Sequence, residues 1–64
     1  MSKKNFSLEE SFNKAINFHT KGKINDAKKI YEEILKFYPD HSLTLTNLGI
    51  VFSQLKDFKK AVEL

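Results

Sequence analysis

Small and aromatic residues of this chain recur with an offset of 34 positions. The aligned pairs are Ala15 with Gly49, Ile16 with Ile50, Phe18 with Phe52, Ile24 with Phe58 and Ala27 with Ala61. A fixed period between 20 and 50 residues is typical of stacked supersecondary units. The period therefore predicts a repeat architecture, whose function depends on a presented surface.

The length and composition limit how such a chain is stabilised. A chain of 64 residues forms one small domain, which buries only about 60% of the surface that its unfolded form exposes. The sequence has no cysteine, so it contains neither a disulfide nor a thiolate metal site. His19 and His41 stand apart from any metal-ligand spacing, and we expect no cofactor.

The net charge of +3 is carried by lysine alone, since the sequence has no arginine. Lysine lacks the planar fork with which arginine grips phosphate. The lysines are scattered along the chain and interleaved with eight acidic residues, which indicates a solvated surface rather than a basic stripe. A nucleic-acid-binding module therefore remains only as an alternative.

We expect a cytoplasmic protein with no membrane partner. Residues 1–6 are predicted to be a flexible tail, and Glu9 and Glu10 stand where a signal peptide needs its apolar core. The chain contains no apolar run of about 20 residues, the length that a membrane-spanning helix requires.

The first predicted helix runs from Leu8 to Thr20. Ser7 and Glu10 have the spacing of a capping box at its start, and Gly22 suits the left-handed position that closes a helix. Asn25 is predicted to cap a second helix, which Pro39 ends because the residue before proline is pushed out of helical geometry. Its predicted buried stripe is Ala27, Ile30, Tyr31, Ile34, Leu35 and Tyr38.

The third predicted helix is capped by Asp40 or Ser42 and runs to about Gln54. A turn at Lys56 and Asp57 should follow, and a short fourth helix should occupy residues 58–64. The predicted packing face of the third helix is Leu45, Leu48, Gly49 and Phe52.

In this arrangement the chain resembles the tetratricopeptide repeat family, with one full repeat at residues 7–41 and one truncated repeat at residues 42–64. The positions that carry the resemblance are Ala15, Phe18, Gly22, Ile24, Ala27, Tyr31 and Pro39 in the first unit, and Leu45, Leu48, Gly49, Phe52, Phe58 and Ala61 in the second. The first unit departs from the pattern at Ser11 and Lys14, where the family usually has a large apolar pair. The resemblance implies an all-α fold of antiparallel helix–turn–helix repeats, a fragment of an α-solenoid with three full helices and a short fourth.

The resemblance also implies a concave groove lined by the first helix of each unit. By register, the groove residues are Glu9, Phe12, Ile16, His19 and Thr20, then Leu43, Thr46, Ile50, Ser53 and Gln54. One subgroup of the family clamps a carboxylate here with lysine and asparagine. Phe12 and Ile16 replace two of those positions, so we expect no such clamp.

These features favour a non-catalytic protein–protein interaction scaffold, which binds a peptide or helix in the groove or associates with its own copies. The acidic pairs are adjacent in sequence and point in different directions on a helix, so they form no catalytic pair. The truncated second unit should leave the third and fourth helices exposed, and we expect a homo-oligomer through them. The alternative is the N-terminal arm of a larger enzyme such as a transferase.

Overall fold

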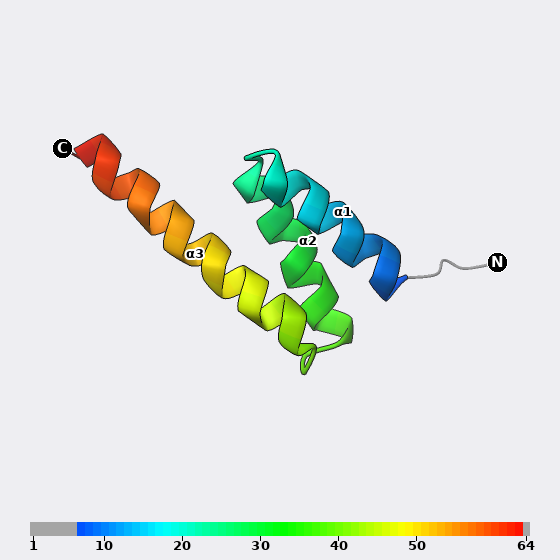
Figure 1. Ribbon diagram of the computed structural model, residues 1–64. Helices are drawn as coiled ribbons and strands as arrows, with labels where there is room; N and C mark the ends of the chain where they lie inside the picture. The colour runs from blue at the N-terminus through cyan, green and yellow to red at the C-terminus, as the bar shows by residue number, and fades with distance from the viewer. Residues whose placement is uncertain (1–6, 64) are drawn as a thin grey trace.

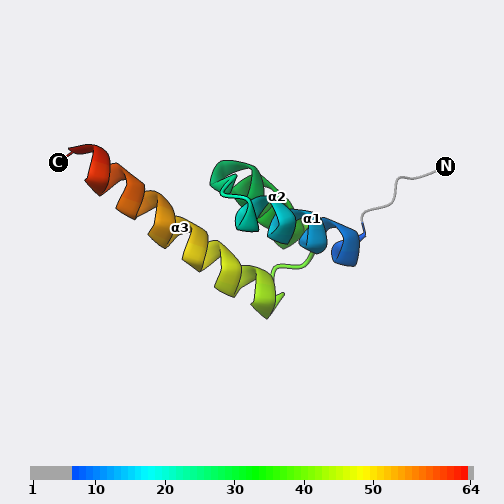
Figure 2. The same ribbon diagram turned by 45° about the horizontal axis from the view of Figure 1, so that its top comes forward.

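The computed structural model describes the backbone of residues 7–63 and the side chains of residues 7–56. It contains three helices: α1 (Leu8–Thr20), α2 (Ile24–Phe37) and α3 (Ser42–Glu63). The chain reverses direction at each loop, and α1 and α3 both pack on α2, as Figure 1 and the rotated view of Figure 2 show. The described part of the chain is thus all-helical, as predicted. The predicted tail at residues 1–6 lies outside it.

Both ends of α1 lie where the sequence predicts them. The Ser7 hydroxyl oxygen accepts a hydrogen bond from the Glu10 amide at 3.3 Å. At the other end Gly22 has a φ of +82°, the Gly22 amide donates to the His19 carbonyl, and the Lys23 amide donates to the Phe18 carbonyl at 2.9 Å. This pair of bonds is a Schellman closure. It turns the chain back so that α2 can pack on α1.

Replacing Gly22 with alanine should lower the free energy of unfolding by about 1 to 2 kcal/mol, because a left-handed φ places a Cβ too close to the following carbonyl oxygen. Thermal unfolding followed by circular dichroism measures the loss. Lys21→Ala is the matched control, since Lys21 has a φ of −88°. Equal melting temperatures for the two variants would contradict this role of Gly22.

The second helix begins two residues earlier than the sequence predicts. Ile24 is its first residue and Lys23 occupies the cap position without a side-chain hydrogen bond, so the predicted Asn25 cap is wrong. Ile24 is only 7% exposed and belongs to the core, so its burial outweighs the weaker preference of asparagine for a cap. The predicted end before Pro39 is confirmed, since α2 stops at Phe37.

The third helix continues through the predicted turn. Residues 42–63 form one helix, so the predicted break at Lys56 and Asp57 and the separate fourth helix are absent from the described residues. The 34-residue register gives the reason. Lys56 occupies the position equivalent to Gly22. A left-handed φ is unfavourable for lysine but not for glycine, so the helix is not closed at Lys56 as it is at Gly22.

His41 caps α3, where Asp40 or Ser42 was predicted. Its carbonyl accepts from the Leu45 amide at 3.0 Å, and its Nδ1 accepts from the Thr44 amide at 3.3 Å. The Thr44 hydroxyl lies 2.7 Å from the same nitrogen. These contacts satisfy the polar groups of Thr44, which is completely buried.

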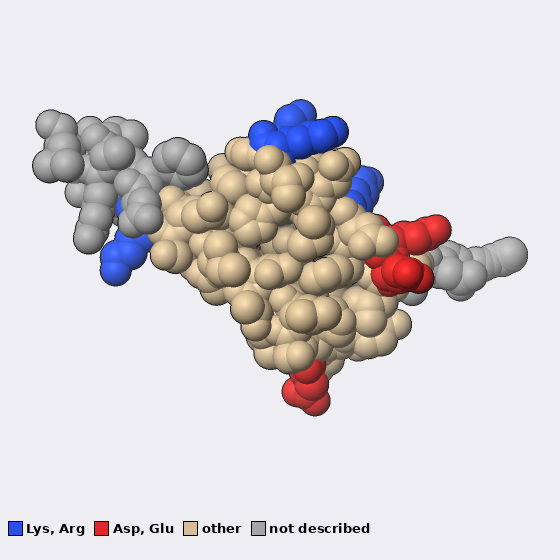
Figure 3. Space-filling model, viewed as in Figure 1, with Lys and Arg blue, Asp and Glu red and all other residues tan. Residues whose placement is uncertain are grey.

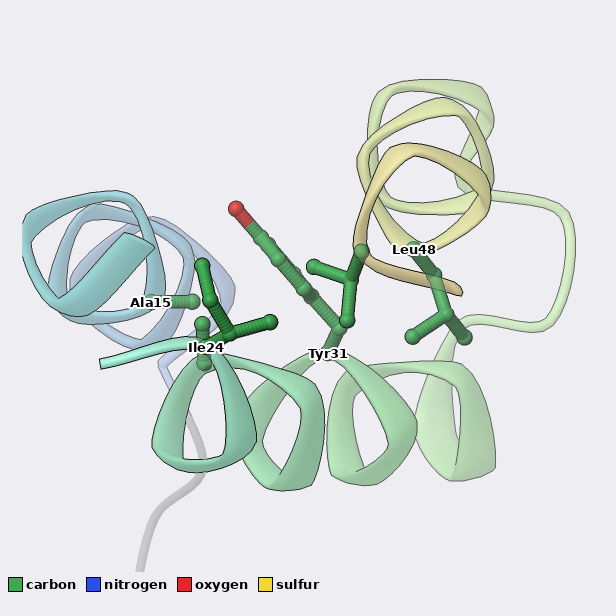
Figure 4. Close-up of a cluster of buried hydrophobic side chains, with 6 residues drawn as sticks. Ala15, Ile24, Tyr31 and Leu48 are labelled. Carbon is green, nitrogen blue, oxygen red and sulfur yellow. The ribbon is translucent and has the colours of Figure 1, made fainter. Parts of the chain in front are cut away.

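The core lies along one face of α2, where small residues allow close helix packing. Ala15 of α1 and Ala27 of α2 are completely buried, together with Tyr31 and Ile34 of α2. The close-up in Figure 4 shows Ala15 beside Ile24, and Tyr31 rising from α2 between α1 and α3. The predicted stripe of α2 is otherwise half-buried at Ile30 and Leu35, and Tyr38 at its end is 41% exposed.

The face with which α3 packs on α2 differs from the predicted one. Thr44 and Val51 are completely buried, and Leu48 is 9% exposed. Leu45 and Phe52 are about half exposed, at 49% and 50%, and Gly49 is also exposed. Of the predicted packing face only Leu48 faces the core. The other three positions are the register equivalents of Ser11, Ala15 and Phe18 on α1, of which Ala15 lies in the core and Phe18 packs against it.

Candidate functional site

Tyr31 forms the floor of the space between α1 and α3. Its side chain is completely buried, and its ring lies 6.1 Å from the ring of Phe12 on α1. The cluster around it includes Leu48 and Val51 from α3. One side chain of α2 therefore contacts both flanking helices and sets their separation (Figure 4).

A chain of hydrogen bonds crosses this space at the level of the Tyr31 hydroxyl. His19 Nε2 lies 2.7 Å from Gln54 Oε1, and His19 Nδ1 lies 3.3 Å from the Tyr31 hydroxyl. Since a carbonyl oxygen only accepts, we assign the imidazole proton to Nε2, and Nδ1 then accepts from Tyr31. Burial raises the pKa of Tyr31, and a hydrogen bond from the Asn47 side chain partly offsets that rise. This series of hydrogen bonds links α1, α2 and α3 through His19, Tyr31 and Gln54.

The other end of the space opens into a hollow of about 350 Å³. It lies between the first turns of α1 and α3, and its lining residues are Leu8, Glu9, Phe12, Asn13, His41 and Leu43. The ring of His41 meets the ring of Phe12 edge-on, with centroids 5.5 Å apart. Because the same imidazole caps α3, its orientation is fixed. The rings of Phe12 and His41 therefore form a fixed wall of the hollow. Leu43, which is 60% exposed, lies at its edge.

The predicted groove residues divide into three groups. Glu9, Phe12 and Leu43 meet in the hollow. His19 joins the hydrogen-bond chain at the opposite end of the space, where the predicted Gln54 is its partner. The remaining predicted residues do not line the hollow: Ile16 is half-buried against the core, and Thr20, Thr46, Ile50 and Ser53 are exposed.

Three residues of the hollow were missed as groove residues in the sequence. The sequence predicts Leu8 only as the first residue of a helix and predicts no role for Asn13. His41 is considered from the sequence only as a metal ligand, a role that its spacing does not support. A signal for His41 was present, because it immediately precedes Ser42 at a helix start and stands three residues before Thr44, the spacing of a side-chain cap.

Charged side chains lie at the margins of the face seen in Figure 3, and its middle is uncharged. Of the six residues of the hollow, only Glu9 carries a fixed charge. Lys28 and Glu32 form an ion pair at 3.8 Å on α2. A phosphate backbone requires a run of cationic side chains, and this face presents none.

Residues 7–63 include no helix that combines the length and apolarity needed to cross a bilayer. Among the side chains of residues 7–56, no three or more His, Cys, Asp or Glu gather in a group that could hold a metal ion.

Comparisons with protein-family models, with curated proteins and with solved structures returned no match.

Proposed function

We propose that this chain is a non-catalytic protein–protein interaction module of the tetratricopeptide-repeat type, which binds a helical or extended peptide between α1 and α3. The hollow beside Phe12 and Leu43 is the observation that carries the proposal. Its size falls in the range of pockets that take a ligand. The module would act in the cytoplasm.

The chemistry of the hollow defines the ligand. Leu8, Phe12 and Leu43 offer apolar surface, which favours an apolar side chain of the peptide as the anchor. Glu9 at the same site favours a lysine or arginine near that anchor. Ile50, which is 46% exposed on α3, extends the apolar surface and favours a second anchor.

Selection from a displayed library of amphipathic peptides tests this proposal. We expect the selected peptides to share an apolar anchor beside a basic residue and to bind at micromolar strength, about −8 kcal/mol. Leu43→Lys should weaken their binding about tenfold or more, measured by titration calorimetry, because it places a charge at the edge of an apolar hollow.

Leu45→Lys is the matched control, since Leu45 is similarly exposed on α3 but lies outside the hollow. It should leave peptide binding unchanged. Peptides that bind the Leu43→Lys variant as tightly as the unmodified protein would contradict the proposed site, and so would a selection that enriches none.

A further inference from the structure

We infer that the outer face of α3 is a second interaction surface, distinct from the hollow, and that its partner is α3 of a second copy of this chain. The outer face is defined by Leu45, Gly49 and Phe52, with Lys56 at its end. It requires neither the hollow nor a peptide ligand, so it goes beyond the proposed function.

The repeat register identifies this face as a helix-packing surface. The equivalent residues of α1 are Ser11, Ala15 and Phe18. Ala15 is completely buried in the contact with α2, and Phe18 packs against the same core. On α3, Leu45 and Phe52 stand on either side of the small residue Gly49 in the same way. These positions are exposed, and Leu45 and Phe52 each expose about half of their surface. Among the described side chains, Lys28 of α2 reaches one edge of this face, with its Nζ 5.8 Å from the centroid of the Phe52 ring, and Leu45, Gly49 and Phe52 stay exposed beside it.

Gly49 shows how closely a partner can approach. A Cβ built on Gly49 meets no atom within 4 Å, so the fold of the single chain does not require glycine there. Glycine in the interior of a helix weakens that helix relative to alanine. An exposed glycine between two apolar side chains is explained by a second helix that crosses at this point with its backbone close.

The outer face is complementary to itself when two copies of α3 run antiparallel. With Gly49 of both copies at the crossing point, Leu45 of each copy meets Phe52 of the other. Lys56 of each copy then reaches the start of the other α3, beside Asp40, which gives an attraction of opposite charges. A twofold axis requires this kind of self-match. The twofold axis repeats the Leu45–Phe52 contact and the Lys56–Asp40 attraction at both ends of the interface, which favours a second copy over an unrelated partner.

The contact is short, and this sets the expected strength of the dimer. The face extends over about three helical turns, which buries less than the 1,200 Å² of a standard stable interface. We therefore expect a weak dimer that forms as the concentration rises. In sedimentation equilibrium between about 10 µM and 1 mM, the average mass should rise from 7.5 kDa towards double that value.

Two variants test the residues that form the contact. Leu45→Lys and Gly49→Leu should each raise the dimer dissociation constant about tenfold or more, the scale of a lost central contact. Leu45 is half exposed and a Cβ at Gly49 meets open space, so both variants should keep the helical circular dichroism of the unmodified chain. Leu43→Lys is the control, because it lies in the hollow and should dimerise normally.

A mass that stays at the monomer value up to the highest concentration would overturn the inference. A dimer that Leu43→Lys weakens as much as Leu45→Lys would place the contact elsewhere. Stronger association of the Gly49→Leu variant would show that no helix backbone approaches at Gly49. The peptide experiment is independent of these results, since Leu45→Lys is expected to lose dimerisation and keep peptide binding.

Discussion

Replacing Tyr31 with alanine is expected to unfold the chain at 25 °C, with loss of most of its helical circular dichroism. Among the described residues, Tyr31 is the largest completely buried side chain, and it contacts residues of both α1 and α3. Truncation of a buried aromatic costs about 3 to 5 kcal/mol. The net stability of a domain is about 5 to 15 kcal/mol, and a chain of this length lies at the low end.

Tyr31→Phe is the control, because it keeps the ring and removes only the hydroxyl that joins the hydrogen-bond chain to His19. It should cost about 1 to 3 kcal/mol of unfolding free energy and leave the chain folded.

A raised pKa of the buried Tyr31 hydroxyl stabilises the fold at pH values below the ordinary tyrosine pKa of about 10. That contribution is lost as the pH rises through the raised pKa, so the Tyr31→Phe variant should lose less stability under alkaline conditions than the unmodified chain. A Tyr31→Ala variant that melts like Tyr31→Phe would contradict the central place of the ring.

Replacing Ala15 with leucine should have the second-largest effect, a loss of about 1 to 3 kcal/mol or more of unfolding free energy. Ala15 is completely buried where α1 crosses α2. A larger side chain there must push the two helices apart, and every contact along the α1–α2 pair weakens with it. Chemical denaturation with urea measures the loss as a lower midpoint.

Two matched changes separate this effect from a general effect of substitution. Asn17→Leu introduces the same side chain at an exposed site of α1 and should change stability by less than about 0.5 kcal/mol. Gly49→Ala adds a Cβ at the register equivalent of Ala15, where it meets open space, and should raise the stability of the monomer by up to about 1 kcal/mol. If Ala15→Leu were tolerated as well as Asn17→Leu, the close approach of α1 and α2 would be wrong.

The local signals in the sequence predict the first two helices well. Ser7, Gly22 and Pro39 act through their own backbone or nearest neighbours, so their roles follow from the chain itself. Ala15 and Ala27 follow from the 34-residue register, Tyr31 and Leu48 follow from the apolar periodicity of their own helices, and all four are buried.

The sequence predicts less where the outcome depends on tertiary contacts. Ile24 enters α2 because its burial outweighs the cap preference of Asn25. The register predicted burial for Leu45 and Phe52, yet such a position is buried only if another helix covers it. A turn was predicted at Lys56 and Asp57, but Lys56 lacks the backbone freedom that Gly22 has at the equivalent register position, and α3 continues through it.

The dependence on tertiary contacts also explains why only some residues of the hollow could be predicted from the sequence. Phe12 and Leu43 were placed in a groove by register, and the structure brings them into one hollow. His41 could not be placed there from periodicity, because it stands in the loop between two helices. Its position depends on the cap of α3 and on the edge of the Phe12 ring.

The proposed groove exists only if α1 and α3 both flank Tyr31. Nuclear Overhauser effects from the Tyr31 ring protons test it most directly, recorded on a dilute sample in which the chain is monomeric. We expect contacts from this one ring to Phe12 of α1 and to Leu48 or Val51 of α3. Contacts to α1 alone would show that α3 does not pack on this face of α2, and the groove would then not exist.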